Sequence, residues 1–190
     1  MNDRTEDARL MARVATGDAA AFARLAERHV GRAHAVAVRM LSSREDAEEV
    51  VQDSLGRAWR HAARFDAGRS AFGTWFYRIV ANGCLDRLRR KDFLNKRTAS
   101  VDIDDAPEIA DERVTAEAGL LAAGRTRAVK AAVAALPERQ RLAIVLCYFE
   151  EIPQAEAARV MGMNLKAVEA LLFRARRSLK TGLKAVLNDD

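Results

Sequence analysis

The sequence predicts an all-α protein built of two small helical domains. Ala, Leu, Arg and Glu dominate its 190 residues, and only three prolines and ten glycines interrupt them, a composition that favours helices over strands. Between Asp102 and Glu112 the helical spacing disappears, and six acidic residues with one proline indicate a flexible linker. We therefore expect domains over residues 1–96 and 113–190, joined by an acidic linker over 97–112.

The first domain opens with two helices and a capping signal for a third. Apolar spacing indicates a short helix over 6–16, and Asp18 is expected to cap a long helix that ends near Leu41. Ser43 is followed three residues later by Asp46 in place of the usual Glu of a capping box, which indicates the start of the third helix. The apolar side of that helix consists of Ala47, Val50, Val51, Leu55, Ala58 and Trp59.

The opposite side of the third helix is acidic and polar. Asp46, Glu49, Gln52 and Asp53 follow the spacing i, i+3, i+6 and i+7, which places them on one face. Such a face is either a solvated surface with favourable charge near the helix start or a docking surface for a basic protein. An acidic patch inside a basic domain does not suit DNA.

A fourth helix is expected from Ser70, its N-cap, to about Lys91. Trp75, Phe76 and Tyr77 are consecutive, so they cannot all face one core, and one of them is expected near the surface, where it can stack on an unpaired base. Farther along, one side carries Asn82, Asp86, Arg89 and Arg90. Because Asn and Arg read base edges and Arg binds phosphate, this helix is either a nucleic-acid contact or an aromatic core with a solvated basic end.

The second domain is also helical throughout. Helical spacing resumes near Val114 and runs to Leu136, and Pro137 then opens a helix that reaches about Phe149. A helix-turn-helix and a tail complete the chain.

The helix-turn-helix is the most informative stretch. A helix with Pro153 in its first turn stops at Gly162, and Asn164 is expected to cap the helix that follows. The residues expected to face the core are Leu165, Val168, Leu171 and Leu172. Those expected to point outward are Lys166, Ala167, Glu169, Ala170, Phe173 and Arg174. Five basic residues and no acid lie between Arg174 and Lys184, where they either contact DNA or complement the helix dipole.

Composition and residue spacing also restrict which partners and which chemistry we expect. The net charge of +5 and pI of about 9.6 suit a polyanionic partner. Cys84 and Cys147 are expected to be buried free thiols of a reducing cytosol, and without a secretory signal or membrane-spanning run we expect a cytoplasmic protein. His29, His34 and His61 lack metal-ligand spacing and enzyme motifs are absent, so we expect no catalytic site, metal or cofactor.

These motifs, in this order, resemble the bacterial sigma factors of the sigma-70 family, specifically the small extracytoplasmic-function (ECF) group. The resemblance covers nearly the whole chain. The segments in which this chain resembles the family are Asp46–Asp53, Phe72–Asn82, Asp86–Arg90, Leu136–Arg141 and the helix-turn-helix that ends with Phe173–Arg176.

The resemblance implies a role for each motif. Docking onto the clamp of core RNA polymerase is implied for Asp46, Glu49, Gln52 and Asp53. Opening and reading of the minus-ten promoter region is implied for Phe65, Arg69, Trp75, Tyr77, Arg78, Asn82, Asp86, Arg89 and Arg90. Contact with the minus-thirty-five element is implied for Arg139, Asn164, Lys166, Ala167, Glu169, Ala170, Phe173, Arg174 and Arg177. The acidic linker is implied to pass through polymerase channels that nucleic acid otherwise occupies.

The chain departs from the family pattern at four positions. The family often has a basic residue, Ser and Arg where this chain has Glu169, Ala170 and Leu171, and a basic residue where it has Ala81. Glu169 can accept a hydrogen bond from a cytosine amino group or pair with a neighbour. The promoter sequence therefore does not follow from the resemblance.

We expect a sigma factor that brings core polymerase to specific promoters and assists melting, with promoter DNA and core RNA polymerase as partners. The resemblance further implies an anti-sigma factor that wedges between the two domains in a stress or signal response. Two alternatives stay open on the residues alone: a helix-turn-helix regulator that binds duplex operators without polymerase, and a helical adaptor whose basic patches are merely solvated.

Overall fold

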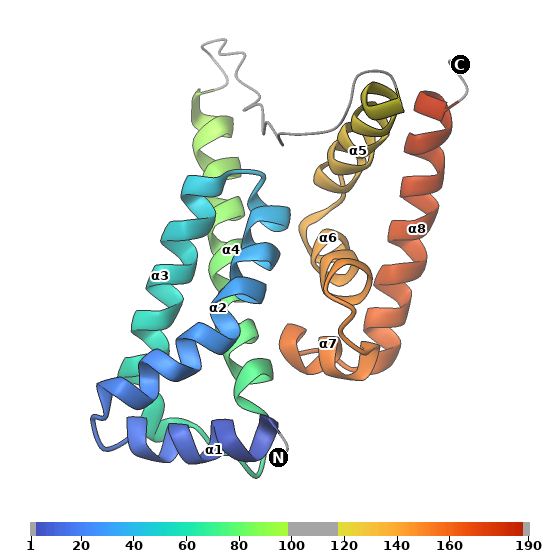
Figure 1. Cartoon of the computed structure of the whole chain (residues 1–190). Coiled ribbons are helices and arrows are strands. Elements are labelled where there is room, and N and C mark those ends of the chain that lie inside the picture. Colours follow the sequence, from blue (N-terminus) through green and yellow to red (C-terminus); the bar gives the residue numbers. More distant parts are fainter. Residues whose placement is uncertain (1–2, 99–117, 188–190) are drawn as a thin grey trace.

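The computed structural model describes residues 3–98 and 118–187, and these residues form helices and connecting turns only. The predicted all-α class is therefore confirmed. Figure 1 shows α1–α4 as one group with the group α5–α8 beside it. The elements are α1 (Asp3–Val14), α2 (Ala19–Leu41), α3 (Arg44–Arg60), the short 3₁₀ helix η1 (Ala62–Arg64), α4 (Phe72–Thr98), α5 (Ala118–Ala134), α6 (Glu138–Ile144), the π-helical turn η2 (Val145–Phe149), α7 (Gln154–Met161) and α8 (Leu165–Leu187).

Two of the predicted caps in the first group are confirmed. The Asp18 carboxylate accepts a hydrogen bond of 2.9 Å from the Ala21 backbone N–H at the start of α2. At the start of α3 the Ser43 hydroxyl oxygen accepts one of 3.2 Å from the Asp46 N–H. Each satisfies a backbone donor that the first turn of a helix leaves free.

The prediction for the fourth helix is wrong at both ends. The Ser70 hydroxyl donates to the Ala71 carbonyl, and the Trp75 N–H bonds the Ala71 carbonyl, so Ala71 rather than Ser70 occupies the N-cap position of α4. The helix continues to Thr98 instead of ending near Lys91, because neither Gly nor Pro interrupts this stretch. Residues 97 and 98 of the predicted linker are thus helical, and 99–112 lie outside the described residues.

The helix-turn-helix prediction is confirmed in the second group. Pro153 precedes α7, and Gly162 ends it in the left-handed conformation with φ of 63°. The Gly162 N–H bonds back to the carbonyls of Ala158 and Arg159, which is how a C-terminal glycine satisfies the last turn of a helix. The predicted beginning of the second domain at 113–117 lies outside the described residues.

The core does not divide cleanly between the two groups. One cluster joins α7 and α8 to α5 and α6 around Val168 and Leu172, both fully buried. The larger cluster contains the buried side chains of α1–α4, and Leu142, Val145 and Leu146 of the second group belong to it as well. The two groups therefore pack against each other through apolar side chains.

Candidate polymerase and promoter interfaces

The second helix of the helix-turn-helix presents an exposed basic face. Asn164 caps it, since its side-chain oxygen accepts a hydrogen bond of 2.8 Å from the Ala167 N–H. Val168, Leu171 and Leu172 are buried as predicted. Leu165 is 42% exposed, so its predicted burial is wrong; it lies in the first turn, before Val168 enters the core.

The side chains predicted to point outward from α8 do so to different degrees. Lys166, Glu169, Phe173, Arg174 and Arg177 are exposed, whereas Ala167 and Ala170 are half-buried. Phe173 is 64% exposed beside Arg174, which pairs an apolar surface suited to a thymine methyl with a guanidinium suited to guanine or phosphate.

Arg139 lies apart from this face. It is exposed on α6, and its Nη1 lies 3.9 Å from the Met163 sulfur in the turn between α7 and α8. It also lines a cavity that faces α4. Its environment therefore differs from that of the other residues predicted to contact the minus-thirty-five element.

The aromatic cluster of α4 leaves Trp75 partly accessible. Phe76 is fully buried, and Trp75 is half-buried, with ring centroids 5.5 Å from Phe65 and 6.0 Å from Phe72. The prediction that one of the three consecutive aromatic side chains lies near the surface is confirmed.

Tyr77 is buried, which contradicts its predicted place on a DNA-binding surface. It is 6% exposed, and its hydroxyl lies 3.1 Å from His29 Nδ1. His29 Nε2 lies 2.8 Å from an Asp7 carboxylate oxygen, so the three side chains link α1, α2 and α4. Burial raises the pKa of Tyr77. In this arrangement the Tyr77 ring supports the packing of α4 and is not free to stack on a base.

The acidic face of α3 is also less uniform than predicted. Gln52 and Asp53 are exposed, but Asp46 is 8% exposed and bonds to Arg87 and Lys91 of α4. Burial by itself raises the pKa of Asp46, but the hydrogen bonds from Lys91 and Arg87 outweigh it and lower that pKa to about 2.

Asp46 therefore joins α3 to α4 instead of facing solvent, and its predicted exposure is wrong. Glu49 is partly engaged as well, because Arg87 donates to both of its carboxylate oxygens. Only part of the acidic face remains accessible to a partner.

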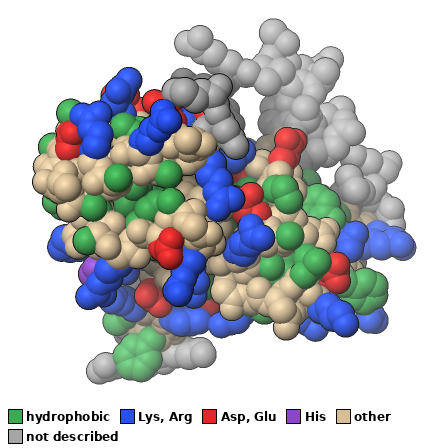
Figure 2. All heavy atoms as spheres, turned by 90° about the horizontal axis from the view of Figure 1, so that it is seen from below, with side chains coloured by type: hydrophobic (Ala, Val, Ile, Leu, Met, Phe, Trp, Pro, Cys, Tyr) green, Lys and Arg blue, Asp and Glu red, His purple; other side chains and the backbone are tan. Residues whose placement is uncertain are grey.

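A cavity of about 420 Å³ lies where the loop over 65–70 and the start of α4 meet α7. Arginine dominates the charges of its lining: Arg64, Arg69, Arg78 and Arg159, against Asp66. Figure 2 views this end of the molecule and shows Lys and Arg side chains spread over it, with carboxylates among them. Phe65 and Trp75 also line the cavity, which places aromatic and cationic groups together as stacking on a nucleic-acid strand requires.

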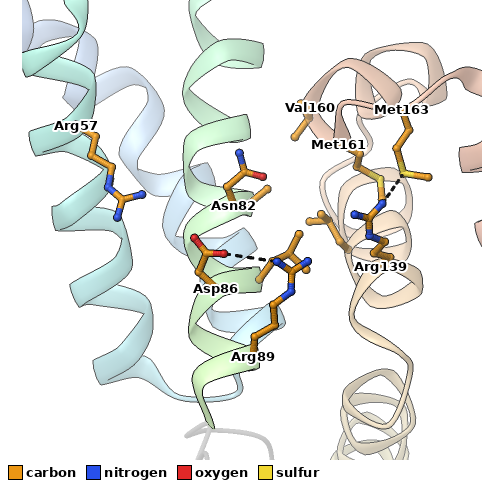
Figure 3. Close-up of a pocket in the computed structure, with 11 residues that line it drawn as sticks. Arg57, Asn82, Asp86, Arg89, Arg139, Val160, Met161 and Met163 are labelled. Atoms are coloured by element: carbon orange, nitrogen blue, oxygen red, sulfur yellow. Dashed lines mark hydrogen bonds and ion pairs between the residues drawn. The ribbon is translucent and has the colours of Figure 1, made fainter. Parts of the chain in front are cut away.

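A second cavity, of about 390 Å³, separates α4 from α6 and α7. Asn82, Asp86 and Arg89 line it from α4, as Figure 3 shows, with Arg139 on the facing side. Arg89 and Asp86 form an ion pair of 3.7 Å one helical turn apart.

Arg57 of α3 lines the same cavity and was missed by the sequence analysis. It follows Asp53 by one helical turn and belongs to neither the acidic face nor the apolar side predicted for this helix. Arg57 lies close to α4 because of the way α3 packs on α4. Spacing within one helix does not reveal how two helices pack.

Both groups of helices match known family models. Residues 25–93 match Sigma-70 region 2 and residues 126–179 match Sigma-70, region 4. The ECF RNA polymerase sigma factor SigM of Mycobacterium tuberculosis is 34% identical over 175 residues, which cover 91% of this chain and 82% of SigM. The RNA polymerase sigma factor CnrH of Cupriavidus metallidurans is 35% identical over 189 residues, which cover 97% of this chain and 98% of CnrH. This chain is an ECF sigma factor of the sigma-70 family.

Solved structures agree with that assignment. CnrH in complex with the cytosolic domain of CnrY superposes with a TM-score of 0.69 at 29% identity, covering 95% of this sigma factor and 98% of CnrH. The sigma factor RpoE of Bartonella quintana, solved with the anti-sigma factor NepR, has a TM-score of 0.68 at 23% identity over 86% of this chain and 96% of RpoE, and supports the fold.

The sigma factor directs RNA polymerase to promoters, and the ranges matched contain its predicted interfaces. The region 2 match contains the acidic face of α3 and the polar face of α4, while the region 4 match contains Arg139 and the exposed residues of α8.

Over residues 3–98 and 118–187 no cluster of three His, Cys, Asp or Glu side chains suits a metal ion, and no helix there combines the length and apolar character needed to cross a membrane. Cys84 is fully buried and Cys147 half-buried, both as free thiols, and burial raises the pKa of Cys84 to about 12.

Proposed function

We propose that Glu49, Gln52 and Asp53 of α3 dock this sigma factor onto the clamp of core RNA polymerase. Gln52 and Asp53 are exposed about two turns away from the buried Asp46. Asp46 contributes indirectly, because its bonds to Arg87 and Lys91 fix α3 against α4. A rigid helix that presents exposed acidic groups suits a basic partner surface.

The same proposal assigns minus-ten recognition to the side of the first group that meets α7. The face combines the accessible ring of Trp75 with the basic cavity around Arg69 and Arg78, and with the exposed polar groups Asn82 and Asp86 farther along α4. A flipped base needs an aromatic surface and polar groups for its edge. This combination supports melting of the start region by the first domain, 1–96.

Recognition of the minus-thirty-five duplex is assigned to α8 of the second domain, 113–190. The observation that carries the proposal is that α8, in a helix-turn-helix capped as predicted, exposes Lys166, Glu169, Phe173 and Arg174 together. Residues near the start of such a helix reach base edges, and the Arg and Lys that follow hold phosphates.

Charge reversal on α3 tests the docking assignment. Asp53→Lys is expected to weaken binding to core polymerase by about tenfold, because it places a cation against a basic surface. Glu27→Lys on α2 is the matched control, since Glu27 is also an exposed acid and the net charge changes equally. Equal affinities of both variants for core polymerase would refute the assignment.

We further propose control by an anti-sigma factor. CnrH, which this chain resembles over nearly its full length, was solved in complex with the cytosolic domain of CnrY. Such a partner would cover the α3 docking face and the DNA helices together. Equal transcription with and without a candidate partner would rule that candidate out.

The protein is proposed to act in the cytoplasm with RNA polymerase and to have no catalytic site of its own. Each group of side chains assembled above suits binding to protein or DNA. Polymerase supplies the chemistry of RNA synthesis.

A further inference from the structure

The two halves of this sigma factor bury a shared apolar interface. Leu142, Val145 and Leu146 of the second half are at most 1% exposed and belong to the cluster formed by the first half. In Figure 1 the second half lies along the side of α2 and α4, and α2 contacts α5, α6 and η2 while α4 contacts α6 and α7. Removal of such side chains from water stabilises a closed arrangement.

Glu150 is a buried carboxylate of η2's C-terminal cap that takes part in the polar contacts of this interface. Its side chain is 9% exposed, and Arg39 Nη1 donates to one carboxylate oxygen at 2.7 Å. Arg32 Nε lies 3.6 Å from the other oxygen. The Arg39 guanidinium also lies 5.2 Å from the centre of the Phe149 ring. Both cations come from α2, so this cluster ties the second half to the first by charge-assisted contacts.

Further polar contacts cross the interface, among them an ion pair of 3.8 Å between Arg89 of α4 and Glu138 of α6. Arg141 of α6 donates to the Met40 carbonyl at 2.6 Å and also bonds the Ala134 carbonyl, so one guanidinium serves the C-terminal ends of α2 and α5. The Thr74 hydroxyl of α4, 5% exposed, donates to the Glu156 carboxylate of α7 at 2.8 Å.

Closure places α6 and α7 in front of the polar face of α4. Asn82, Asp86 and Arg89 line the cavity that Arg139 faces from the other side (Figure 3). A volume of about 390 Å³ is that of a pocket for one small molecule, too small for a strand of several nucleotides. DNA can lie along this face of α4 only after the second half has moved away.

We propose that this sigma factor inhibits itself by closure, and that Glu150, held by Arg32 and Arg39, is the latch of the closed state. The inference rests on the proposed minus-ten role of α4. Only the open fraction of molecules binds DNA, so apparent affinity scales with that fraction. Neutralising Glu150 leaves its cations without a counter-charge, shifts the population toward the open state, and raises DNA affinity without any change in a DNA-contacting residue.

The test compares Glu150→Gln with Glu151→Gln in the full chain. Glu151 is the neighbouring acid, is exposed, and changes the net charge equally, so it controls for nonspecific attraction to DNA. Small-angle scattering measures the radius of gyration, and amide hydrogen exchange measures the protection of 78–90 in α4. Fluorescence anisotropy measures affinity for a random-sequence single-stranded 20-mer.

Glu150→Gln is expected to enlarge the radius of gyration, to expose α4, and to raise affinity for the 20-mer about tenfold, while Glu151→Gln matches the wild type. Arg39→Gln, a change at a half-exposed side chain of α2, is expected to open the protein similarly, and the double variant is expected to add little. If Glu150→Gln and Arg39→Gln both keep the radius of gyration of the wild type, Glu150 is not the latch. Opening without any gain in affinity, when the wild type binds the 20-mer measurably, would overturn self-inhibition.

A failure of the proposed function gives a different result. If no form of the protein binds the 20-mer while scattering still separates Glu150→Gln from Glu151→Gln, the closure is supported and the DNA-binding role of α4 is wrong.

Discussion

Replacement of Asp46 by Asn removes the charge that joins α3 to α4. The Asp46 carboxylate is 11% exposed and accepts a hydrogen bond of 2.8 Å from Arg87 Nε, with Lys91 bonded to its other oxygen. Asparagine preserves the shape and one acceptor but takes the Asp46 counter-charge away from Lys91 and Arg87, although Arg87 keeps its bonds to Glu49. We expect a loss of folding stability with little change in the folded structure.

The size of the loss follows from the pKa of Asp46. A fall from the usual 3.8 to about 2 corresponds to about 2 kcal/mol of stabilisation by the ionised form. Lys91 is 48% exposed and Arg87 27%, so solvent weakens the pair. We therefore expect Asp46→Asn to lower the free energy of unfolding by about 1–2 kcal/mol at pH 7.

The pH dependence has a definite sign. Since the folded pKa is depressed, the contribution of Asp46 is complete above the unfolded value of 3.8 and is lost as the pH falls through about 2. Urea unfolding of wild type and Asp46→Asn at several pH values should thus show a difference at pH 7 that shrinks below about pH 4.

Asp53→Asn is the control, because Asp53 is exposed on the same helix, and its effect should stay within about 0.5 kcal/mol. Equal stability of wild type and Asp46→Asn at pH 7, or a difference that persists unchanged to pH 2, would refute the reasoning.

Three other predictions concern separate parts of the molecule. Arg174→Ala should weaken minus-thirty-five binding by about 1–3 kcal/mol if Arg174 contacts a base, or flatten the salt dependence if it contacts phosphate; no change in either removes it from the interface. Gly162→Ala should cost about 1–2 kcal/mol in urea unfolding, since φ is 63° and the new Cβ would lie 3.2 Å from an Arg78 nitrogen; unchanged stability would contradict this. Cys84 should resist a thiol reagent until the protein unfolds, whereas half-buried Cys147 reacts earlier; equal rates in the native protein would contradict this.

Signals carried by a few neighbouring residues predicted the structure well. The caps at Asp18, Ser43 and Asn164 and the stop at Gly162 all depend on side chains that bond backbone within one helical turn. These local interactions do not depend on the rest of the fold, which is why the helix-turn-helix could be predicted.

The errors at Asp46 and Tyr77 arose because a distant partner decides the environment of each. Asp46 follows an exposed acidic spacing, yet Arg87 and Lys91, about 40 residues later in the chain, bury it. Tyr77 follows Trp75 and Phe76 directly, and helical spacing alone did not show which of the three is exposed; Tyr77 is buried because it packs against His29 from α2. The Glu150 cluster depends on how the halves meet, which no spacing within either half specifies.

The central claim is that this chain gives core RNA polymerase its promoter specificity, and initiation in a purified system tests it most directly. Core polymerase and host genomic DNA are incubated with and without the protein, and the 5′ ends of the transcripts are mapped. The account predicts transcripts that start at defined positions only when the protein is present, fewer of them with Asp53→Lys, and unchanged start sites with Glu27→Lys. Binding to duplex DNA without any new start site would contradict it and favour an ordinary helix-turn-helix regulator.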